Sequence, residues 1–140
     1  MNYKYSATSQ ASRTNFKMKI QLIEINKICL AEIVSDQIVL NNTQDAVELI
    51  ANCHYKGAEG IILKEENVTD AFFDLKTRVA GDMLQKFSTY QSRLAIVGNF
   101  GKYTSNSFKD FVRESNKLGR INFVSTMEEA RICLTKIADY

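Results

Sequence analysis

Hydrophobic and polar residues alternate in the first patterned stretch of the chain, KMKIQLIEI. Met18, Ile20 and Leu22 fall on one side of an extended chain, so this stretch predicts a half-buried strand. The apolar run ICLAEIV follows Asn26 and Lys27, a pair that suits a two-residue hairpin turn. The patterned part of the chain is therefore predicted to begin with an antiparallel hairpin.

Beyond the hairpin, helical patterns alternate with short apolar runs of strand length. The runs GIILK, RLAIV and RINFV lack strict alternation, as expected for strands buried on both faces. The helical patterns lie in NNTQDAVELIANCHYKG, TDAFFDLKTRVAGDMLQKFSTYQ, SNSFKDFVRESNKLG and the segment from STMEEA onward. The order ββαβαβαβα predicts an α/β fold, two-layer or sandwich, with a mostly parallel central sheet covered by helices.

Capping side chains mark the expected helix ends. Asn41 or Asn42 begins the first helix, and Gly57 ends it. In the second helix, Asp74 and Arg78 are four positions apart, which predicts a pair on one face. The later signals are Ser105 or Asn106 before the third helix, Gly119 after it, and Ser125 and Thr126 ahead of Glu128 and Glu129 in capping-box spacing.

The length of 140 residues fits one domain, and the composition places its start near residue 17. Residues 1–16 are polar and lack periodicity, so we expect a flexible tail with a short strand near Tyr3–Tyr5. Residues 17–140 are expected to form a single α/β domain.

The charge balance excludes several classes of partner. The chain has 18 basic and 16 acidic side chains, so its net charge of +2 predicts no strong field for nucleic acid or anionic lipid. No apolar run approaches the ~20 residues of a membrane span. The N-terminal residues also lack the apolar core of a secretory signal. We therefore expect a cytoplasmic protein without nucleic acid or membrane as partner.

Few residues suit a metal. Cys29, Cys53 and Cys133 form no CxxC pair and lie among apolar residues, which predicts buried thiols. His54 is the single histidine, and no His/Cys spacing supports a zinc site. Neither a metal nor a cofactor is expected.

The stretch VGNFGKYTS raises the question of a phosphate-binding loop. A nucleotide-hydrolysing loop needs four residues between its glycines, then Lys followed by Ser or Thr. Here two residues separate Gly98 from Gly101, and Tyr103 follows Lys102. The glycines are therefore expected to permit a tight turn. Lys102 and free N–H groups at the next helix start remain candidates to hold one anionic group.

Polar residues at the carboxyl ends of neighbouring strands form the candidate ligand site, because ligands of parallel sheets bind beyond those ends. KEEN follows one strand and GNFGKYTS another; a solvated loop is the alternative for KEEN. Two lysines suit an anion, and Tyr103 suits stacking against a ring. The expected wall of a small-anion pocket consists of Lys64, Glu65, Asn67, Lys76, Asn99, Lys102, Tyr103 and Ser105.

The helix KDFVRESNK carries a second candidate surface. Asp110 and Glu114 are like charges four positions apart, and so are Lys109 and Arg113, a pattern that lowers helix stability. A protein partner is the hypothesis for Asp110, Arg113, Glu114 and Asn116. The first hairpin leaves a strand edge that needs covering, which predicts a homodimer.

Three stretches resemble the bacterial domain-of-unknown-function family 4180: KEENVTDAFFDLKTRVAGDMLQKFSTY, LAIVGNFGKYTSNSFKDFVRESNKLG and FVSTMEEA. The likeness covers most of residues 18–130, and the family name implies no activity. The order of elements also resembles the STAS domain of anti-sigma-factor antagonists, which implies protein interaction. The Ser and the Gly of that family's phosphorylated D-S-[ST]-G motif are missing here, where Thr69 and Asp70 occupy the equivalent segment.

The predicted function is a non-catalytic regulatory or small-anion-binding module. The sequence shows no nucleophile–base pair, no metal cluster and no working phosphate loop. A STAS-like protein-interaction domain is the first alternative. The second is a hydrolase for a small phosphate- or ester-containing substrate, which would use Glu65 or Asp74 with Lys76.

Overall fold

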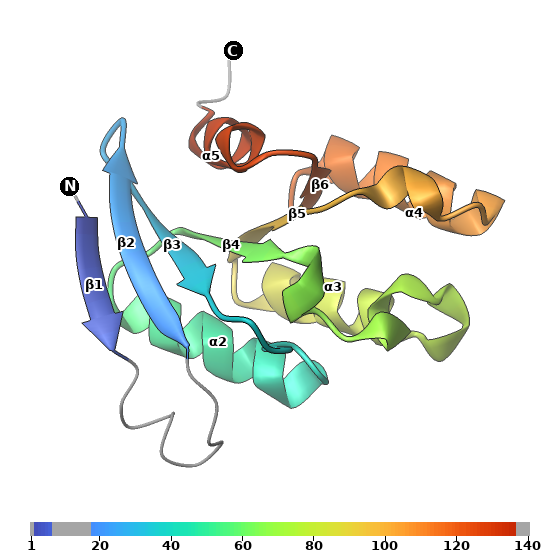
Figure 1. Ribbon diagram of the computed structural model, residues 1–140, viewed down its shortest axis with the longest axis horizontal. Helices are drawn as coiled ribbons and strands as arrows, with labels where there is room; N and C mark the ends of the chain where they lie inside the picture. The colour runs from blue at the N-terminus through green and yellow to red at the C-terminus, as the bar shows by residue number, and fades with distance from the viewer. Residues whose placement is uncertain (1, 7–17, 137–140) are drawn as a thin grey trace.

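Figure 1 shows the computed structural model, which describes residues 2–6 and 18–136. A 6-stranded sheet runs in the order β1-β2-β3-β4-β5-β6. The first three strands pair antiparallel and the others parallel, which confirms the predicted α/β fold. The strands are β1 (Asn2–Ser6), β2 (Lys19–Ile25), β3 (Ile28–Val34), β4 (Gly60–Lys64), β5 (Arg93–Val97) and β6 (Ile121–Val124).

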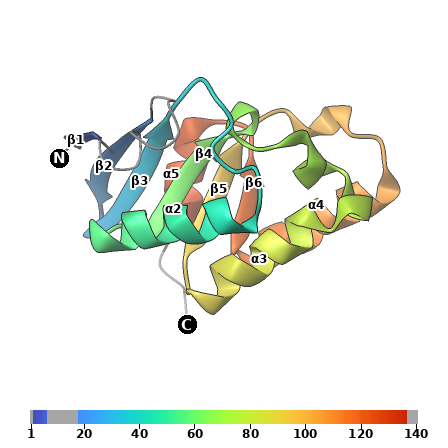
Figure 2. The ribbon, with the colours of Figure 1, turned by 90° about the horizontal axis from the view of Figure 1, so that it is seen from below.

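Helices cover both faces of the sheet. They are α2 (Thr43–Tyr55), α3 (Val79–Thr89), α4 (Asn106–Leu118) and α5 (Met127–Thr135). Figures 1 and 2 show α2 and α3 side by side on one face and α5 on the other. The buried hydrophobic residues form two core clusters. The larger cluster lies between the sheet and α2, α3 and the start of α4, and the smaller cluster lies between the sheet and α5. None of the helices in the described ranges is long and apolar enough to cross a membrane.

The predicted turn and caps are confirmed. Asn26 and Lys27 have φ of 53° and 68°, the two left-handed positions of a tight hairpin turn. The side chain of Asn42 accepts the Asp45 N–H at 2.9 Å and caps α2. The remaining caps are Ser105 before α4, the reciprocal Thr126–Glu129 box before α5, and Gly57 and Gly119 at positive φ after α2 and α4.

The long second helix predicted from Thr69 onward is wrong in its first half. Residues 65–77 form three short 3₁₀ turns, and α3 begins only at Val79. The Asp74 carboxylate accepts the Lys76 N–H at 3.1 Å, and Arg78 adopts a left-handed φ of 68°. Such local side-chain bonds compete with helix formation, so Asp74 and Arg78 do not share a helical face.

The N-terminal residues differ in part from the expected tail. Residues 2–6 form β1, with Asn2 opposite Ile23, so the short strand expected near Tyr3–Tyr5 is present and belongs to the sheet. The rest of the predicted tail, residue 1 and residues 7–16, lies outside the described residues. The domain start near residue 17 therefore stays a prediction.

Two arginines connect α5 to the rest of the fold through hydrogen bonds and an ion pair. Arg93 donates hydrogen bonds to the carbonyls of Gly119, Cys133 and Leu134 at 3.0, 2.9 and 3.3 Å. Arg131 makes a two-pronged ion pair with Glu32 on β3, at 2.7 and 3.0 Å. The Glu32 side chain is only 8% exposed, so this ion pair lies between α5 and the sheet and not on open surface.

Candidate functional site

The candidate site lies where the carboxyl ends of β4 and β5 meet. A 3₁₀ turn, Glu65–Asn67, follows β4 directly. Gly98 and Asn99 follow β5 and lead into a second turn, Phe100–Lys102. Because β4 and β5 pair in parallel, with Lys64 opposite Val97, the KEEN and GNFGK segments emerge at the same sheet edge.

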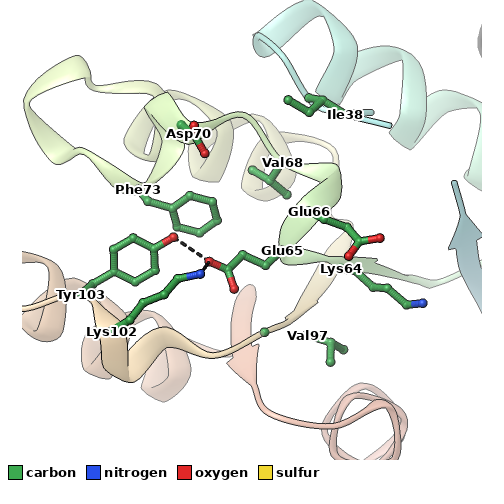
Figure 3. Close-up of a pocket in the computed structure, with 11 residues that line it drawn as sticks. Ile38, Lys64, Glu65, Glu66, Val68, Asp70, Phe73, Val97, Lys102 and Tyr103 are labelled. Atoms are coloured by element: carbon green, nitrogen blue, oxygen red, sulfur yellow. Dashed lines mark hydrogen bonds and ion pairs between the residues drawn. The ribbon is translucent and has the colours of Figure 1, made fainter. Parts of the chain in front are cut away.

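The Glu65 carboxylate is the centre of this site (Figure 3). Its Oε2 atom accepts the Tyr103 hydroxyl at 2.6 Å and lies 2.8 Å from Nζ of Lys102. Its Oε1 atom accepts the backbone N–H of Asn99 at 3.2 Å. In a phosphate loop, the lysine and the backbone N–H groups would bind the phosphates of a nucleotide. In the GNFGK loop, the Lys102 ammonium and the Asn99 N–H instead bind the Glu65 carboxylate of the protein itself.

These contacts set the protonation states of the site. Burial raises the pKa of Glu65, but hydrogen bonds from Lys102, Tyr103 and Asn99 outweigh it and bring that pKa below its ordinary value. Burial and the hydrogen bond to Glu65 raise the pKa of Tyr103. Near neutral pH the carboxylate is therefore ionised and the phenol keeps its proton.

Gly98 is required because Glu65 lies against it. A Cβ atom on Gly98 would lie 2.6 Å from Oε1 and 2.7 Å from Cβ of Glu65, closer than atoms pack. The positive-φ glycines of the described chain are Gly57 and Gly119, so Gly98 is needed for space and not for a left-handed turn. Sequence reasoning assigned this glycine to a tight turn, because nothing in the loop itself indicates the approach of Glu65.

An aromatic cluster holds Tyr103 in place. The Phe73 ring stacks on Tyr103 with centroids 5.2 Å apart and planes 15° apart, and Phe108 lies 5.0 Å from Tyr103 on centroids. The Phe73 ring therefore covers one face of the Tyr103 ring, whereas the sequence suggested that Tyr103 stacks on a ligand. The cluster consists of Phe72, Phe73, Phe100, Tyr103, Phe108, Phe111 and Phe123.

A pocket of about 450 Å³ opens beside the Glu65 carboxylate. Its charged lining comprises two lysines and three carboxylates, a formal charge of −1, which favours a simple anion less than the sequence suggested. Ile38, Val68, Phe73 and Val97 supply its apolar surface. The charged residues are Lys64, Lys102, Glu65, Glu66 and Asp70.

The residues predicted to line one small-anion pocket lie in several different places in the structure. Lys64, Glu65, Lys102 and Tyr103 line the pocket together, and Asn99 contributes its N–H to Glu65. The side chains of Lys76 and Ser105 line a neighbouring cavity of about 530 Å³ that shares Phe73 with the first. Glu66, Asp70 and Gly98, by contrast, line the pocket although sequence reasoning did not select them.

Asn67 does not line the pocket; its side chain hydrogen-bonds two neighbouring segments of the backbone. It is 0% exposed, and its Oδ1 atom accepts the Lys64 N–H at 3.1 Å. Its Nδ2 group donates to the carbonyls of Ser35 and Gln37 at 2.9 and 2.8 Å. The amide therefore ties the end of β4 to the loop that follows β3.

We expect Asn67→Ala to lower the free energy of unfolding by about 2–3 kcal/mol, because it leaves one N–H and two carbonyls without their partner in a buried site. Urea unfolding measures this loss. Asn41→Ala, at an exposed asparagine, is the matched control and should change stability by less than about 0.5 kcal/mol. Equal effects of the two substitutions would contradict the role given to Asn67.

The residues predicted to bind a protein lie on α4 and have unequal roles. Asp110 and Arg113 form an ion pair one turn apart, with side chains 64% and 65% exposed. Glu114 is exposed. Asn116, in contrast, hydrogen-bonds the backbone of Phe123 in β6.

Among the described residues, no three His, Cys, Asp or Glu side chains come together in a group that could hold a metal ion. The three thiols are free: Cys53 is buried, whereas Cys29 and Cys133 are half-buried. Burial raises the pKa of Cys53 to about 12, so this thiol is unreactive at neutral pH.

The family described as Domain of unknown function (DUF4180) matches residues 25–134. The chain belongs to this family. The match runs from the end of β2 into α5, so the Glu65 site and the aromatic cluster both lie within the DUF4180 domain. A search of curated proteins gave no match. The family description carries no activity, and the function is therefore argued from the site.

Proposed function

We propose that this DUF4180 domain is a non-catalytic regulatory module of the cytoplasm that binds a small polar molecule in the pocket beside Glu65. One observation carries the proposal: three donors from the end of β5 fix the Glu65 carboxylate at the carboxyl edge of the parallel strands. Ligand pockets of such sheets occur at this edge, with a few fixed polar groups and an apolar wall.

The lining specifies the chemistry of the ligand. The Lys102 ammonium has two further N–H donors besides the one facing Glu65, and Lys64 adds a second cation, so both suit an anionic group. Glu66 and Asp70 bring negative charge to the same pocket and suit an amine or another donor. A small zwitterion matches this lining better than a simple anion does, because the formal pocket charge is −1.

The protonation states favour binding over acid–base catalysis. A general base works best with a pKa near the operating pH, whereas the pKa of Glu65 is lowered. A general acid must release its proton readily, whereas the pKa of Tyr103 is raised. The two shifts run opposite to those that proton transfer at neutral pH requires.

The experiment is a titration of the protein with inorganic phosphate, acetate and glycine, followed by NMR shifts of the Asn99 and Lys102 amides. We expect glycine, which carries both charges, to shift these amides at lower concentration than acetate. Lys102→Ala should weaken binding at least tenfold, since a charge-assisted hydrogen bond contributes ~1.5–3 kcal/mol. Lys109→Ala, an exposed lysine on α4, is the matched control and should leave the affinity unchanged.

Two results would contradict the proposal. The first is that all three probes leave these amides unshifted, or that Lys102→Ala and Lys109→Ala behave alike. The second is turnover of phosphoester or ester substrates that is lost in Glu65→Gln but kept in Lys109→Ala, which would show the domain to be a hydrolase.

A further inference from the structure

A second pocket lies at the opposite end of the parallel strands, where β4 and β5 begin. Its volume is about 450 Å³, within the range of small-molecule sites. Three separate segments bring cations to it: Arg93 is the first residue of β5, Arg120 directly precedes β6, and Lys136 directly follows α5. The packed fold therefore gathers side chains that are far apart in the sequence.

The charge of this pocket is opposite in sign to that of the pocket beside Glu65. Its lining holds the three cations and one carboxylate, Glu59, which gives a formal charge of +2 with His54 counted as neutral. The whole chain also has a net charge of only +2. Among the described residues, none of the three cations forms an ion pair with a carboxylate.

The helix ends beside this pocket account for only part of its positive charge. Residues at or just beyond the ends of α2, α3 and α5 line it, and the last carbonyls of a helix attract cations. Backbone N–H groups that follow α2 and α3 already donate to carbonyls in the last turns of those helices. Arg93 donates to two carbonyls at the end of α5 and to one that follows α4. These bonds cap the helices without Arg120 or Lys136.

Arg120 and Lys136 keep most of their donors for another acceptor. Among the described residues, the Arg120 guanidinium makes one hydrogen bond, to the carbonyl of Ser92 at 3.3 Å. The Lys136 side chain is exposed and makes none with that part of the chain. A guanidinium has five N–H donors and an ammonium three, so both side chains can bind further oxygen atoms.

Apolar side chains complete the pocket. Ala58 and Leu134 are each 3% exposed, and Ile28 is half-buried. A pocket of this size and lining suits a molecule that carries a carbon skeleton beside its charged group.

We propose that this pocket binds the phosphate group of a small phosphorylated organic molecule, at a site separate from the pocket beside Glu65. Paired N–H donors of a guanidinium match the oxygen atoms of a phosphate, which favours Arg120 as the main contact, and Lys136 adds a second cation. A phosphate monoester carries about two negative charges near neutral pH and so balances the formal charge of +2. A carboxylate would leave half of that charge unbalanced.

The experiment is a titration of the full-length protein with phenyl phosphate and, separately, with benzoate, followed by NMR shifts of backbone amides. Both probes carry an aromatic ring, but only phenyl phosphate is a dianion. We expect phenyl phosphate to shift the Arg93 and Arg120 amides at a several-fold lower concentration than benzoate, while the Asn99 and Lys102 amides beside Glu65 stay unshifted. The proposal fails if the Arg93 and Arg120 amides stay unshifted, or if the shifts are confined to Asn99 and Lys102.

Two charge-removing variants test the contacts. Arg120→Gln and Lys136→Gln should each weaken the binding of phenyl phosphate about tenfold, because each removes a charge-assisted hydrogen bond. The exposed Lys136 side chain keeps the test valid should Arg120→Gln fail to fold. Lys117→Gln is the matched control: it removes the same charge from an exposed position on α4 outside the pocket and should leave the affinity unchanged. Equal weakening by Lys136→Gln and Lys117→Gln would show a general attraction to basic surface and would overturn the proposal.

Discussion

Phe108→Ala is expected to lower the free energy of unfolding by about 4 kcal/mol, within the range for removal of a buried aromatic ring. Phe108 is 2% exposed, and its ring lies about 5–6 Å from those of Phe73, Tyr103 and Phe123 on centroids. Its removal leaves a cavity between α4, β6 and the loops of the site. Urea unfolding followed by far-UV circular dichroism measures the loss.

The same substitution should loosen the site as well as the core. Tyr103 touches Glu65 through its hydroxyl and Phe108 through its ring, so a cavity beside the ring frees the phenol to move. Phe108→Leu keeps most of the volume and should cost only about 1–1.5 kcal/mol. A loss below about 1 kcal/mol in the alanine variant would show that the cluster collapses around the gap and does not hold Tyr103.

Arg131→Met is expected to cost about 3 kcal/mol, because it leaves the Glu32 carboxylate charged, almost buried and without its partner. The matched comparison is Arg113→Met, which breaks the exposed pair with Asp110 and should cost less than about 1 kcal/mol. Urea unfolding of both variants at pH 7 measures the difference. Both are arginine–carboxylate pairs, but the Glu32 pair is two-pronged and almost buried whereas the Asp110 pair is exposed, so burial and geometry together separate the expected effects.

A double variant distinguishes the effect of losing the Arg131–Glu32 ion pair from the effect of leaving the Glu32 carboxylate charged without a partner. Glu32→Leu combined with Arg131→Met removes both charges, and its stability should return to within about 1 kcal/mol of the unmodified protein. A double variant that is less stable than Arg131→Met alone would show that the ion pair stabilises the docking of α5 in its own right.

Much of the fold was predictable because its signals are local. The turn at Asn26 and Lys27 and the cap at Asn42 depend on side-chain chemistry within a few residues, and each lies where the sequence predicted. The alternation of apolar runs and helical patterns likewise predicted parallel strands, which bring KEEN and GNFGK to one edge. Strand order is therefore enough to predict that these two segments emerge side by side.

The segment between β4 and α3 was not predictable from its pattern. Its apolar residues have helical spacing, yet short side-chain bonds such as that of Asp74 to the Lys76 N–H form 3₁₀ turns there. These turns place Phe72 and Phe73 in the aromatic cluster. These local bonds outweighed helix propensity, which is a weak preference for each residue.

The roles of individual polar residues depended on the tertiary structure. Glu65 meets Tyr103 38 positions later, and Asn67 bonds carbonyls 30 and 32 positions earlier. A sequence shows which groups can donate or accept, and strand order shows which segments emerge together. Whether a carboxylate binds a ligand or an internal lysine depends on distances of a few tenths of an ångström, which only the packed chain determines, because hydrogen bonds weaken steeply beyond such distances.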